Sequence, residues 1–263
     1  MVVSKDQGQS WSQANVPFDA TLTAVFFLDD QLGWAVGHDG AILRTDNGGS
    51  DWQLQRLDVD ARAPLLDIWF HDQDNGIAVG GNSTLLVSSD GGRNWRSGPT
   101  LYDPDEFELN LFAIAALPNG TLAVAAESGY AFRSTDLGET WQRSRLPYTG
   151  SMFGALAMEN RLVFFGLLGH AFISADDGVT WSSISTGTEE SLLGGYVDSS
   201  GDLFLVGMGG AVVHSADKGQ SFDSIQVAGR LPFTAMVRSQ SGDQLFFFGG
   251  AGVHQRNHHS IKQ

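Results

Sequence analysis

The sequence contains no cysteine, and this absence limits the chemistry that the protein can use. A chain of 263 residues without a thiol has no disulfide, no thiolate nucleophile and no cysteine metal ligand. It also has no run of about 18 apolar residues that could span a membrane. Long segments with helical spacing are absent as well, while 33 glycines indicate short strands joined by tight turns.

Basic residues are also scarce. Lys and Arg together number 15 against 30 Asp and Glu, which gives a formal net charge of -15. Proteins bind the phosphate backbone through Lys and Arg, so we do not expect a nucleic-acid partner. No lysine-rich segment of the kind that adheres to anionic lipids is present either. Because no apolar run is long enough to span a bilayer, we expect no direct membrane insertion.

Six copies of one short motif recur along the chain. They follow Ser-x-Asp-x-Gly-x-(Ser/Thr/Asn)-(Trp/Phe), and we interpret residues 45–52 as a variant copy with a one-residue insertion. The aspartates assigned to the motif are Asp6, Asp46, Asp90, Asp136, Asp176 and Asp217. Their intervals of 40, 44, 46, 40 and 41 residues match the period of a four-stranded propeller blade.

Two apolar runs precede each motif. The run about ten residues upstream is nearly continuous, as at 33–37 and 203–207, which predicts a strand buried on both faces. The run before it predicts the innermost strand of each blade, at residues 23–28, 65–70, 111–117, 153–158, 193–197 and 233–237. A third strand leads into the motif, and a fourth follows it.

These repeats predict an all-β fold, a propeller of six four-stranded antiparallel blades in a single domain over residues 1–263. The last blade lacks a motif and an outer strand, whereas the N-terminus has both without a blade of its own. We therefore expect the N-terminal strand to complete the last blade and close the ring, which removes an exposed sheet edge. Seven blades are the alternative if further residues precede this sequence.

The motif aspartate is expected to have a structural role. Its carboxylate can accept main-chain N–H groups in the turn between the third and fourth strands. The motif glycine permits a positive φ, and the Trp or Phe packs beneath the turn. Outward-facing turns cannot converge on one ion, so we predict neither a metal site nor a cofactor.

The motif is identified as an Asp-box, also called the bacterial neuraminidase repeat. Residues 35–46 resemble the blades of the photosystem II assembly and stability factor family, and weaker copies follow at 76–95, 122–141, 164–181 and 205–222. The resemblance implies a non-enzymatic protein-binding factor that helps a membrane or envelope complex to assemble by binding one of its subunits. It also implies an extracytoplasmic location, in a periplasm or a thylakoid lumen.

In photosynthetic members, the resemblance further implies, arginines just before the Asp-box form a basic stripe for the partner. This sequence keeps Arg44 and Arg133 at that position. The other copies have Val87, Ile173, His214 and Gln255 there. A client outside photosystem II, in another envelope complex, is therefore an equal alternative.

Partner-binding residues are expected on one face of the blades. The loops from the fourth strand to the next blade and from the second strand to the third form this face, and loops vary over a rigid scaffold. Arginine and tyrosine are enriched in interface hot spots. The candidates are Arg62, Tyr102, Arg143, Arg145, Tyr148 and Arg230, with His38, Asp39, Asn82, Glu127 and His170 nearer the axis. We expect the protein to act as a monomer.

An acidic insertion at residues 100–109 has two interpretations. It could dock a partner or hold calcium through Asp103, Asp105 and Glu106. It lacks the glycine and regularly spaced oxygens of a dedicated calcium loop, which favours a solvated acidic loop.

A glycoside hydrolase or carbohydrate-binding propeller is the alternative function. Sialidases need converging arginines and an activated tyrosine, but the Phe/Tyr-Arg-Ile-Pro motif that opens their fold is absent. Asp39 and Glu127 would be the best pair of inward carboxylates for another glycosidase. Only their position recommends them, so we predict that the protein is not an enzyme.

Overall fold

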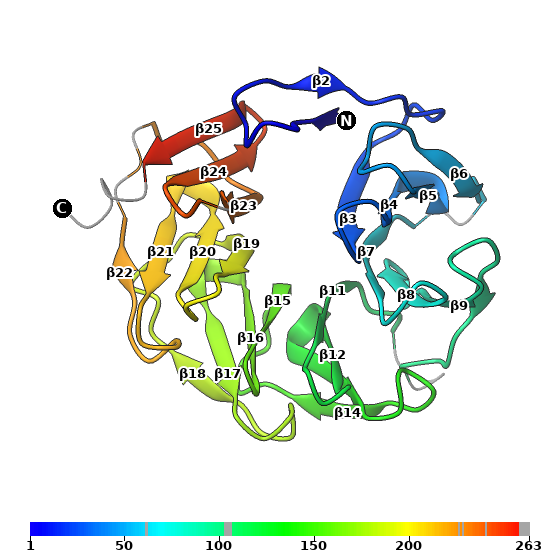
Figure 1. Ribbon diagram of the computed structural model, residues 1–263. Coiled ribbons are helices and arrows are strands. Elements are labelled where there is room, and N and C mark those ends of the chain that lie inside the picture. The colour runs from blue at the N-terminus through cyan, green and yellow to red at the C-terminus, as the bar shows by residue number, and fades with distance from the viewer. Residues whose placement is uncertain (61–62, 103–106, 226, 228, 240, 258–263) are drawn as a thin grey trace. The chain divides into compact units, whose positions relative to one another are not determined.

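The computed structural model describes residues 1–60, 63–102, 107–225, 227, 229–239 and 241–257 (Figure 1). The candidate residue Arg62 and the acidic residues Asp103, Asp105 and Glu106 lie outside the described residues. The chain forms two compact units. The first unit comprises residues 1–114 and 136–141, and the second comprises residues 115–135 and 142–263.

The first unit contains two four-stranded antiparallel sheets and an N-terminal hairpin. Neighbouring strands in each sheet are consecutive in the chain. The first sheet consists of β3 (Leu22–Phe27), β4 (Gly33–Gly37), β5 (Ile42–Thr45) and β6 (Gln53–Arg56). The second consists of β7 (Leu65–Phe70), β8 (Asn75–Gly80), β9 (Leu85–Ser89) and β10 (Arg96–Ser97). The hairpin pairs β1 (Val2–Val3) with β2 (Ser12–Gln13).

The second unit contains two four-stranded sheets and one of three strands. The four-stranded sheets are β15 (Met152–Met158), β16 (Arg161–Gly166), β17 (Ala171–Ser174) and β18 (Ser182–Ile184), then β19 (Leu192–Val197), β20 (Leu203–Gly207), β21 (Val212–Ser215) and β22 (Asp223–Ser224). The last sheet is β23 (Ala235–Arg238), β24 (Gln244–Gly249) and β25 (Gly252–Asn257). One more four-stranded sheet has residues in both units and consists of β11 (Leu111–Ala116), β12 (Leu122–Ala126), β13 (Tyr130–Ser134) and β14 (Gln142–Arg145).

The described residues thus form six antiparallel blades, and the predicted all-β propeller class is confirmed. The second strands are buried as their apolar sequences predict, with every residue of β4, β12 and β20 buried. The helical elements of the described chain are turns of three residues, and none has the length and apolar character needed to cross a membrane. A single domain comprising all six blades stays a prediction.

The last blade differs from the expectation. Its sheet contains three strands among the described residues, and β1 pairs with β2 instead of supplying a fourth strand. The motif at residues 4–11 turns the chain back, so the hydrogen bonds of β1 go to its own hairpin partner. Closure of a ring by the N-terminal strand stays a prediction.

The Asp-box turns have the predicted structural role. In the copy at Asp176, the carboxylate accepts the Thr180 N–H at 2.9 Å and the Thr180 hydroxyl at 2.6 Å. The same hydrogen bonds lower the pKa of Asp176 below its usual value, and the bond from the Thr180 side chain contributes most. Asp6, Asp90, Asp136 and Asp217 bind the residue four positions on in the same way. Asp90, Asp136, Asp176 and Asp217 therefore hold the turns between the third and fourth strands, and Asp6 holds the turn between β1 and β2.

Asp46 was wrongly assigned to this role. Asn47 occupies the aspartate position, because its Oδ1 accepts the Asp51 N–H at 3.0 Å, while Thr45 Oγ1 accepts the Gly49 N–H. Asp46 instead forms a long ion pair with Arg44, at 3.8 Å. Residues 45–52 therefore match the ordinary spacing with Thr, Asn and Asp as substitutions, and they contain no insertion.

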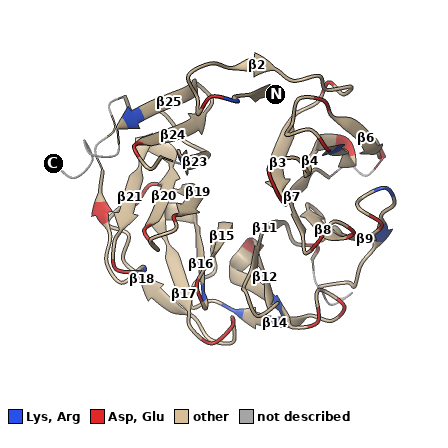
Figure 2. Cartoon of the chain, in the orientation of Figure 1, with Lys and Arg blue, Asp and Glu red and all other residues tan. Residues whose placement is uncertain are grey.

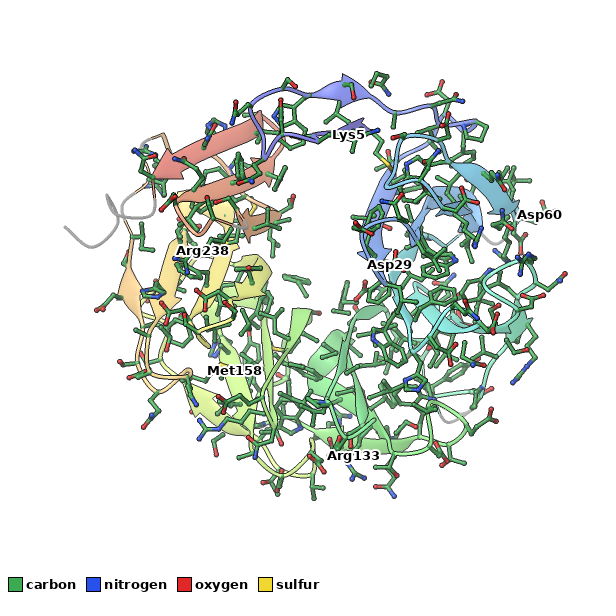
Figure 3. All side chains as sticks on the ribbon, viewed as in Figure 1. Lys5, Asp29, Asp60, Arg133, Met158 and Arg238 are labelled. Carbon is green, nitrogen blue, oxygen red and sulfur yellow. The ribbon has the colours of Figure 1, made fainter. Side chains whose placement is uncertain are left out.

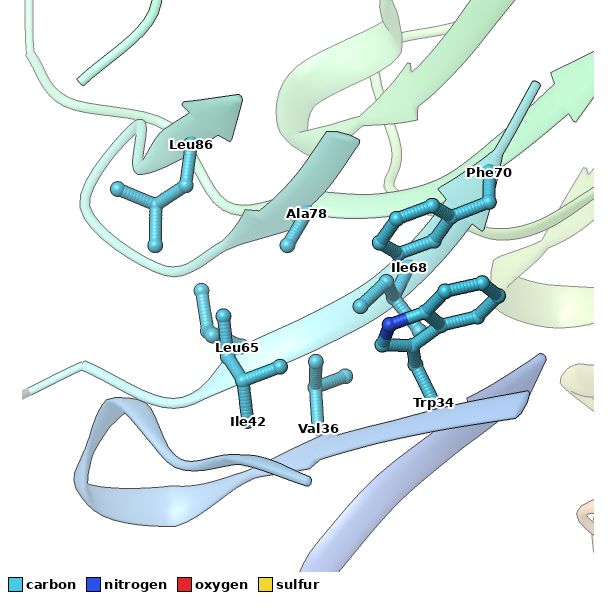
Figure 4. Packing of buried hydrophobic residues seen from close by; sticks show 8 residues of the cluster. All are labelled: Trp34, Val36, Ile42, Leu65, Ile68, Phe70, Ala78 and Leu86. Carbon is cyan, nitrogen blue, oxygen red and sulfur yellow. The ribbon is translucent and has the colours of Figure 1, made fainter. Parts of the chain in front are cut away.

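Aromatic packing joins the two complete sheets of the first unit (Figure 4). Trp34 of β4 is fully buried and stacks on Phe70 of β7, with ring centres 3.5 Å apart and an interplanar angle of 7°. Its Nε1 donates to the Gly91 carbonyl oxygen at 3.0 Å, in the Asp-box turn of the neighbouring blade. One indole thus supports both the core and the turn.

The first residue of the Asp-box provides a test of turn stability. Ser174 is buried, and its Oγ accepts the Gly178 N–H at 2.8 Å and donates to Asp176 at 2.8 Å. We expect Ser174→Ala to lower the free energy of unfolding by about 1–3 kcal/mol, because it leaves a buried N–H without a partner. Urea denaturation measures this change. The exposed Ser183→Ala on β18 is the control, and an equal effect in both variants would contradict the role given to Ser174.

Candidate functional site

Three-residue turns follow the second strand in four of the blades. They are η1 (His38–Gly40), η2 (Glu127–Gly129), η3 (Leu167–Gly169) and η4 (Met208–Gly210). The central residue of each has left-handed backbone angles, with φ between 55° and 61°. The closing glycine packs against the loop that leaves the fourth strand of the same blade. A Cβ at Gly129 would overlap the Tyr148 carbonyl oxygen, and one at Gly169 would overlap that of Thr188.

His38 and Asp39 lie in η1 of the first unit, where both are exposed. The Asp39 carbonyl oxygen accepts the Asp58 N–H at 2.8 Å. Arg56 donates to the Gly40 carbonyl oxygen and to Asp58, both at 2.7 Å. These bonds attach the turn to the end of β6 and fix its position.

Arg143 and Arg145 of β14 gather around Tyr130, the first residue of β13. The Cζ atoms of Arg145 and Arg143 lie 3.6 Å and 5.3 Å from the centre of the Tyr130 ring, within the range of cation–π contacts. Arg145 also donates to the Tyr130 hydroxyl and to the Ser128 carbonyl oxygen. Tyr130 is buried, whereas both arginines are exposed. The tyrosine therefore positions two solvent-facing cations.

Tyr148 continues this surface toward the next blade. Its ring stacks on His170, with centres 3.8 Å apart and an interplanar angle of 26°, and both rings stack on the buried Phe172. The Leu146 N–H donates to the Gly129 carbonyl oxygen at 2.9 Å, which holds the Tyr148 loop against η2. We call the following residues of the second unit the loop cluster: Glu127, Tyr130, Arg143, Arg145, Tyr148 and His170.

The other candidates are not joined to this cluster by the contacts of the described residues. Arg230 forms an ion pair with Glu190 at 3.0 Å, in the loop that packs on η4. Tyr102 belongs to the first unit, in the segment before residues 103–106. Of the predicted residues, the described contacts bring together Arg143 and Arg145, with Tyr148 on the adjoining loop, and a role of these residues in partner binding stays a prediction.

Tyr130 was missed as a site residue by the sequence reasoning, whereas His170 was expected near the axis. Both directly follow the closing glycine of a turn, at a position that Ala41 and Ala211 occupy in other blades. An aromatic ring in place of a repeated alanine is a signal that the sequence does contain.

Charge is distributed unevenly over the second unit. Three cations among its described residues lie against carboxylates: Lys218 with Glu159 at 2.5 Å, Arg230 with Glu190 at 3.0 Å, and Arg238 with Asp198 (Figure 3 labels Arg238). The partners of the Arg145 guanidinium are neutral oxygens. Figure 2 shows basic residues on β14, which stand out on a chain of net charge -15. This strand therefore carries two exposed cations with which an acidic group could pair.

Arg133, which precedes an Asp-box as in the predicted basic stripe, is already engaged. Its Nε donates to the Asp177 carbonyl oxygen at 2.7 Å, in the Asp-box turn of the next blade. Its Nη1 donates to the Gln142 side chain at 3.2 Å.

Among the described residues, no group of three or more His, Asp or Glu side chains is placed to hold a metal ion.

Known structures share this fold. A structure of YCF48 from Cyanidioschyzon merolae is similar over 98% of this chain and 88% of its own, with a TM-score of 0.71 and 15% identity. A structure described as YCF48 bound to D1 peptide is similar over 92% of this chain and 95% of its own, with a TM-score of 0.56 and 19% identity. An ancestral GH74 enzyme is similar over 90% of this chain but only 38% of its own, with a TM-score of 0.66 and 12% identity.

Sequence comparison gives the family. A curated relative, the chloroplastic photosystem II stability/assembly factor HCF136 of Guillardia theta, is 40% identical over 45 residues, which are 16% of this chain and 11% of that relative. The match thus spans about a tenth of that relative's length. The family model described as photosynthesis system II assembly factor YCF48 matches residues 3–65 and 54–192. Since these segments cover well over half of the sequence, the chain belongs to the photosynthesis system II assembly factor YCF48 family.

Proposed function

We propose that the protein is a non-catalytic assembly factor that binds a protein subunit of a membrane complex. The observation that carries the proposal is the loop cluster, where two exposed arginines lie against the buried Tyr130 and the Tyr148–His170 stack lies on a buried phenylalanine. Arginine and tyrosine dominate the binding energy of many protein interfaces. Membership of an assembly-factor family supports the same function.

The cluster would recognise its partner with little change of shape. The turn η2 and the Tyr148 loop are joined by the hydrogen bond from the Leu146 N–H to the Gly129 carbonyl oxygen, and Gly129 packs directly against the Tyr148 carbonyl oxygen. A rigid surface loses little conformational entropy when it binds. Guanidinium groups pair with carboxylates through two parallel hydrogen bonds, so an acidic or C-terminal peptide segment fits the arginines best.

The proposal about the kind of partner is drawn from related proteins. One solved relative is described as bound to D1 peptide, and we propose that a subunit of a photosystem complex, or of another envelope complex, takes the equivalent place here. A glycoside hydrolase has less support, since likeness to the GH74 enzyme concerns the fold alone.

We also propose that the protein works as a monomer in an extracytoplasmic compartment, which gel filtration and cell fractionation would test.

The proposal predicts that reversing two charges abolishes partner capture. In Arg143→Glu/Arg145→Glu, capture of a membrane-complex subunit from detergent-solubilised membranes should fall about tenfold or more, because each arginine is exchanged for a repelling carboxylate. Mass spectrometry of the captured proteins measures the loss. Isothermal titration with a synthetic D1 peptide then measures affinity directly.

The matched control is Arg256→Glu, an exposed arginine on β25 of the same unit. Its capture should stay at the level of the unaltered protein, and circular dichroism should show all variants folded. Equal capture by the double variant and the unaltered protein would remove the loop cluster as the binding surface. Absence of any captured subunit would argue against the assembly function itself.

A further inference from the structure

A groove of about 590 Å³ lies in the first unit. It is bordered by the end of β7 with the following turn, by β10, and by the Asp-box turn at residues 136–139. All of these residues belong to the first unit. Its volume is in the range of small-molecule binding sites. The loop cluster has no part in it.

Trp69 forms an aromatic wall of this groove. Its ring lies 5.8 Å from that of His71, which is exposed, and both residues line the groove. The indoles of Trp34, Trp52, Trp95 and Trp141 each donate to a glycine carbonyl oxygen. The Trp69 indole, by contrast, makes no hydrogen bond within the described residues. It therefore offers a ring face and a donor to a ligand.

The polar lining of the groove disfavours an anionic ligand. Asp72, Asp136 and Glu139 contribute three carboxylates, against one guanidinium from Arg96. Arg96 itself lies 3.9 Å from Glu139 across the rim. Asp72 accepts hydrogen bonds from the Asn75 side chain and from the main-chain N–H groups of Asn75 and Asp74. These bonds lower the pKa of Asp72, and the bond from the Asn75 side chain contributes most. A ligand here must tolerate carboxylates and exchange hydrogen bonds with them.

We propose that this groove binds a neutral oligosaccharide, with one pyranose ring against Trp69. The C–H groups of a sugar face are slightly positive and meet the negative face of the indole. Sugar hydroxyls both donate and accept, so they can serve the rim carboxylates, the Arg96 guanidinium and the Trp69 N–H together. Pockets of this kind combine an aromatic wall with a few polar groups that fix orientation.

Titration of neutral tetrasaccharides tests this proposal. Cellotetraose, maltotetraose and N-acetylated chitotetraose are each added at millimolar concentration, with saturation-transfer NMR and calorimetry as readouts. We expect at least one to bind, and Trp69→Leu to weaken that binding at least tenfold. The matched control is Tyr196→Leu, because Tyr196 faces Phe204 in β20 at the register where Trp69 faces Ile77 in β8.

A second variant keeps the test independent of folding. Glu139→Ala changes an exposed rim residue and should weaken binding about threefold or more while leaving stability unchanged. Binding that is equal in the unaltered protein, Trp69→Leu and Glu139→Ala would overturn the site. Failure of all three tetrasaccharides to bind would overturn the ligand class.

Discussion

Replacing Trp34 with alanine is expected to lower the free energy of unfolding by about 3–5 kcal/mol, the range for losing a large buried aromatic side chain. The substitution removes a fully buried indole and its stack on Phe70. It also leaves the Gly91 carbonyl oxygen without the Trp34 N–H. Urea denaturation followed by circular dichroism measures the change. A domain of ordinary stability would lose a large part of its free energy of unfolding.

Val179→Ala serves as the control for this prediction. Val179 sits in an Asp-box turn and is 56% exposed, so its truncation should change the free energy of unfolding by less than about 0.5 kcal/mol. A loss of under 1 kcal/mol in Trp34→Ala would mean that the stack on Phe70 contributes little to the core.

A second large effect is expected from Asp67, which links β7 to β11. The carboxylate accepts the Ile68 N–H at 2.8 Å and the Ile114 N–H at 2.7 Å. Desolvation between the packed strands nonetheless raises its pKa to about 6 from the usual 3.8, because burial disfavours the charged form more than the two bonds support it. The folded protein therefore holds this proton at a pH where the unfolded chain has lost it.

The consequence is a loss of stability as the pH rises. Below about pH 4, Asp67 is protonated in both states and has no effect. Between pH 4 and 6 only the unfolded chain releases the proton, so the free energy of unfolding falls, by about 3 kcal/mol for a shift of this size. The depressed pKa values of the Asp-box aspartates, such as about 2 for Asp6 and Asp217, act in the separate window below pH 4.

Asp67→Asn isolates this contribution. Asparagine keeps an acceptor for the Ile114 N–H but does not titrate, so the variant should gain stability relative to the unaltered protein between pH 4 and 7.5. Urea denaturation at several pH values measures the difference, in which the contributions of the histidines cancel. A difference that stays constant over this range would contradict the assignment of a raised pKa to Asp67.

Much of the fold follows from repetition in the sequence. The apolar run at 203–207 lies between two strands and is buried completely, as a continuous run predicts. Errors arose where a repeat departs from its pattern. Asp46 was chosen over Asn47 because the motif was read by residue type, whereas the hydrogen bonds depend on spacing from Thr45 to Trp52.

The candidate site was harder to predict, because it depends on contacts between blades. Tyr148 and His170 come from different blades and meet by stacking, which no local pattern encodes. Arg143 and Arg145 were identified by type, yet their positions depend on Tyr130 beneath them. Arg230, of the same type, is instead engaged by Glu190.

The three-residue turns have a consequence for how such proteins diversify. Their central positions hold an acid, a hydroxyl, an apolar chain and no side chain at all, in Asp39, Ser128, Leu168 and Gly209. The backbone angles are nearly the same in all four, so one backbone conformation accommodates four different kinds of side chain. Exchanging one of these side chains for another would change the chemistry of the surface while the turn keeps its backbone conformation. β-Branched residues are the exception, because they disfavour a positive φ.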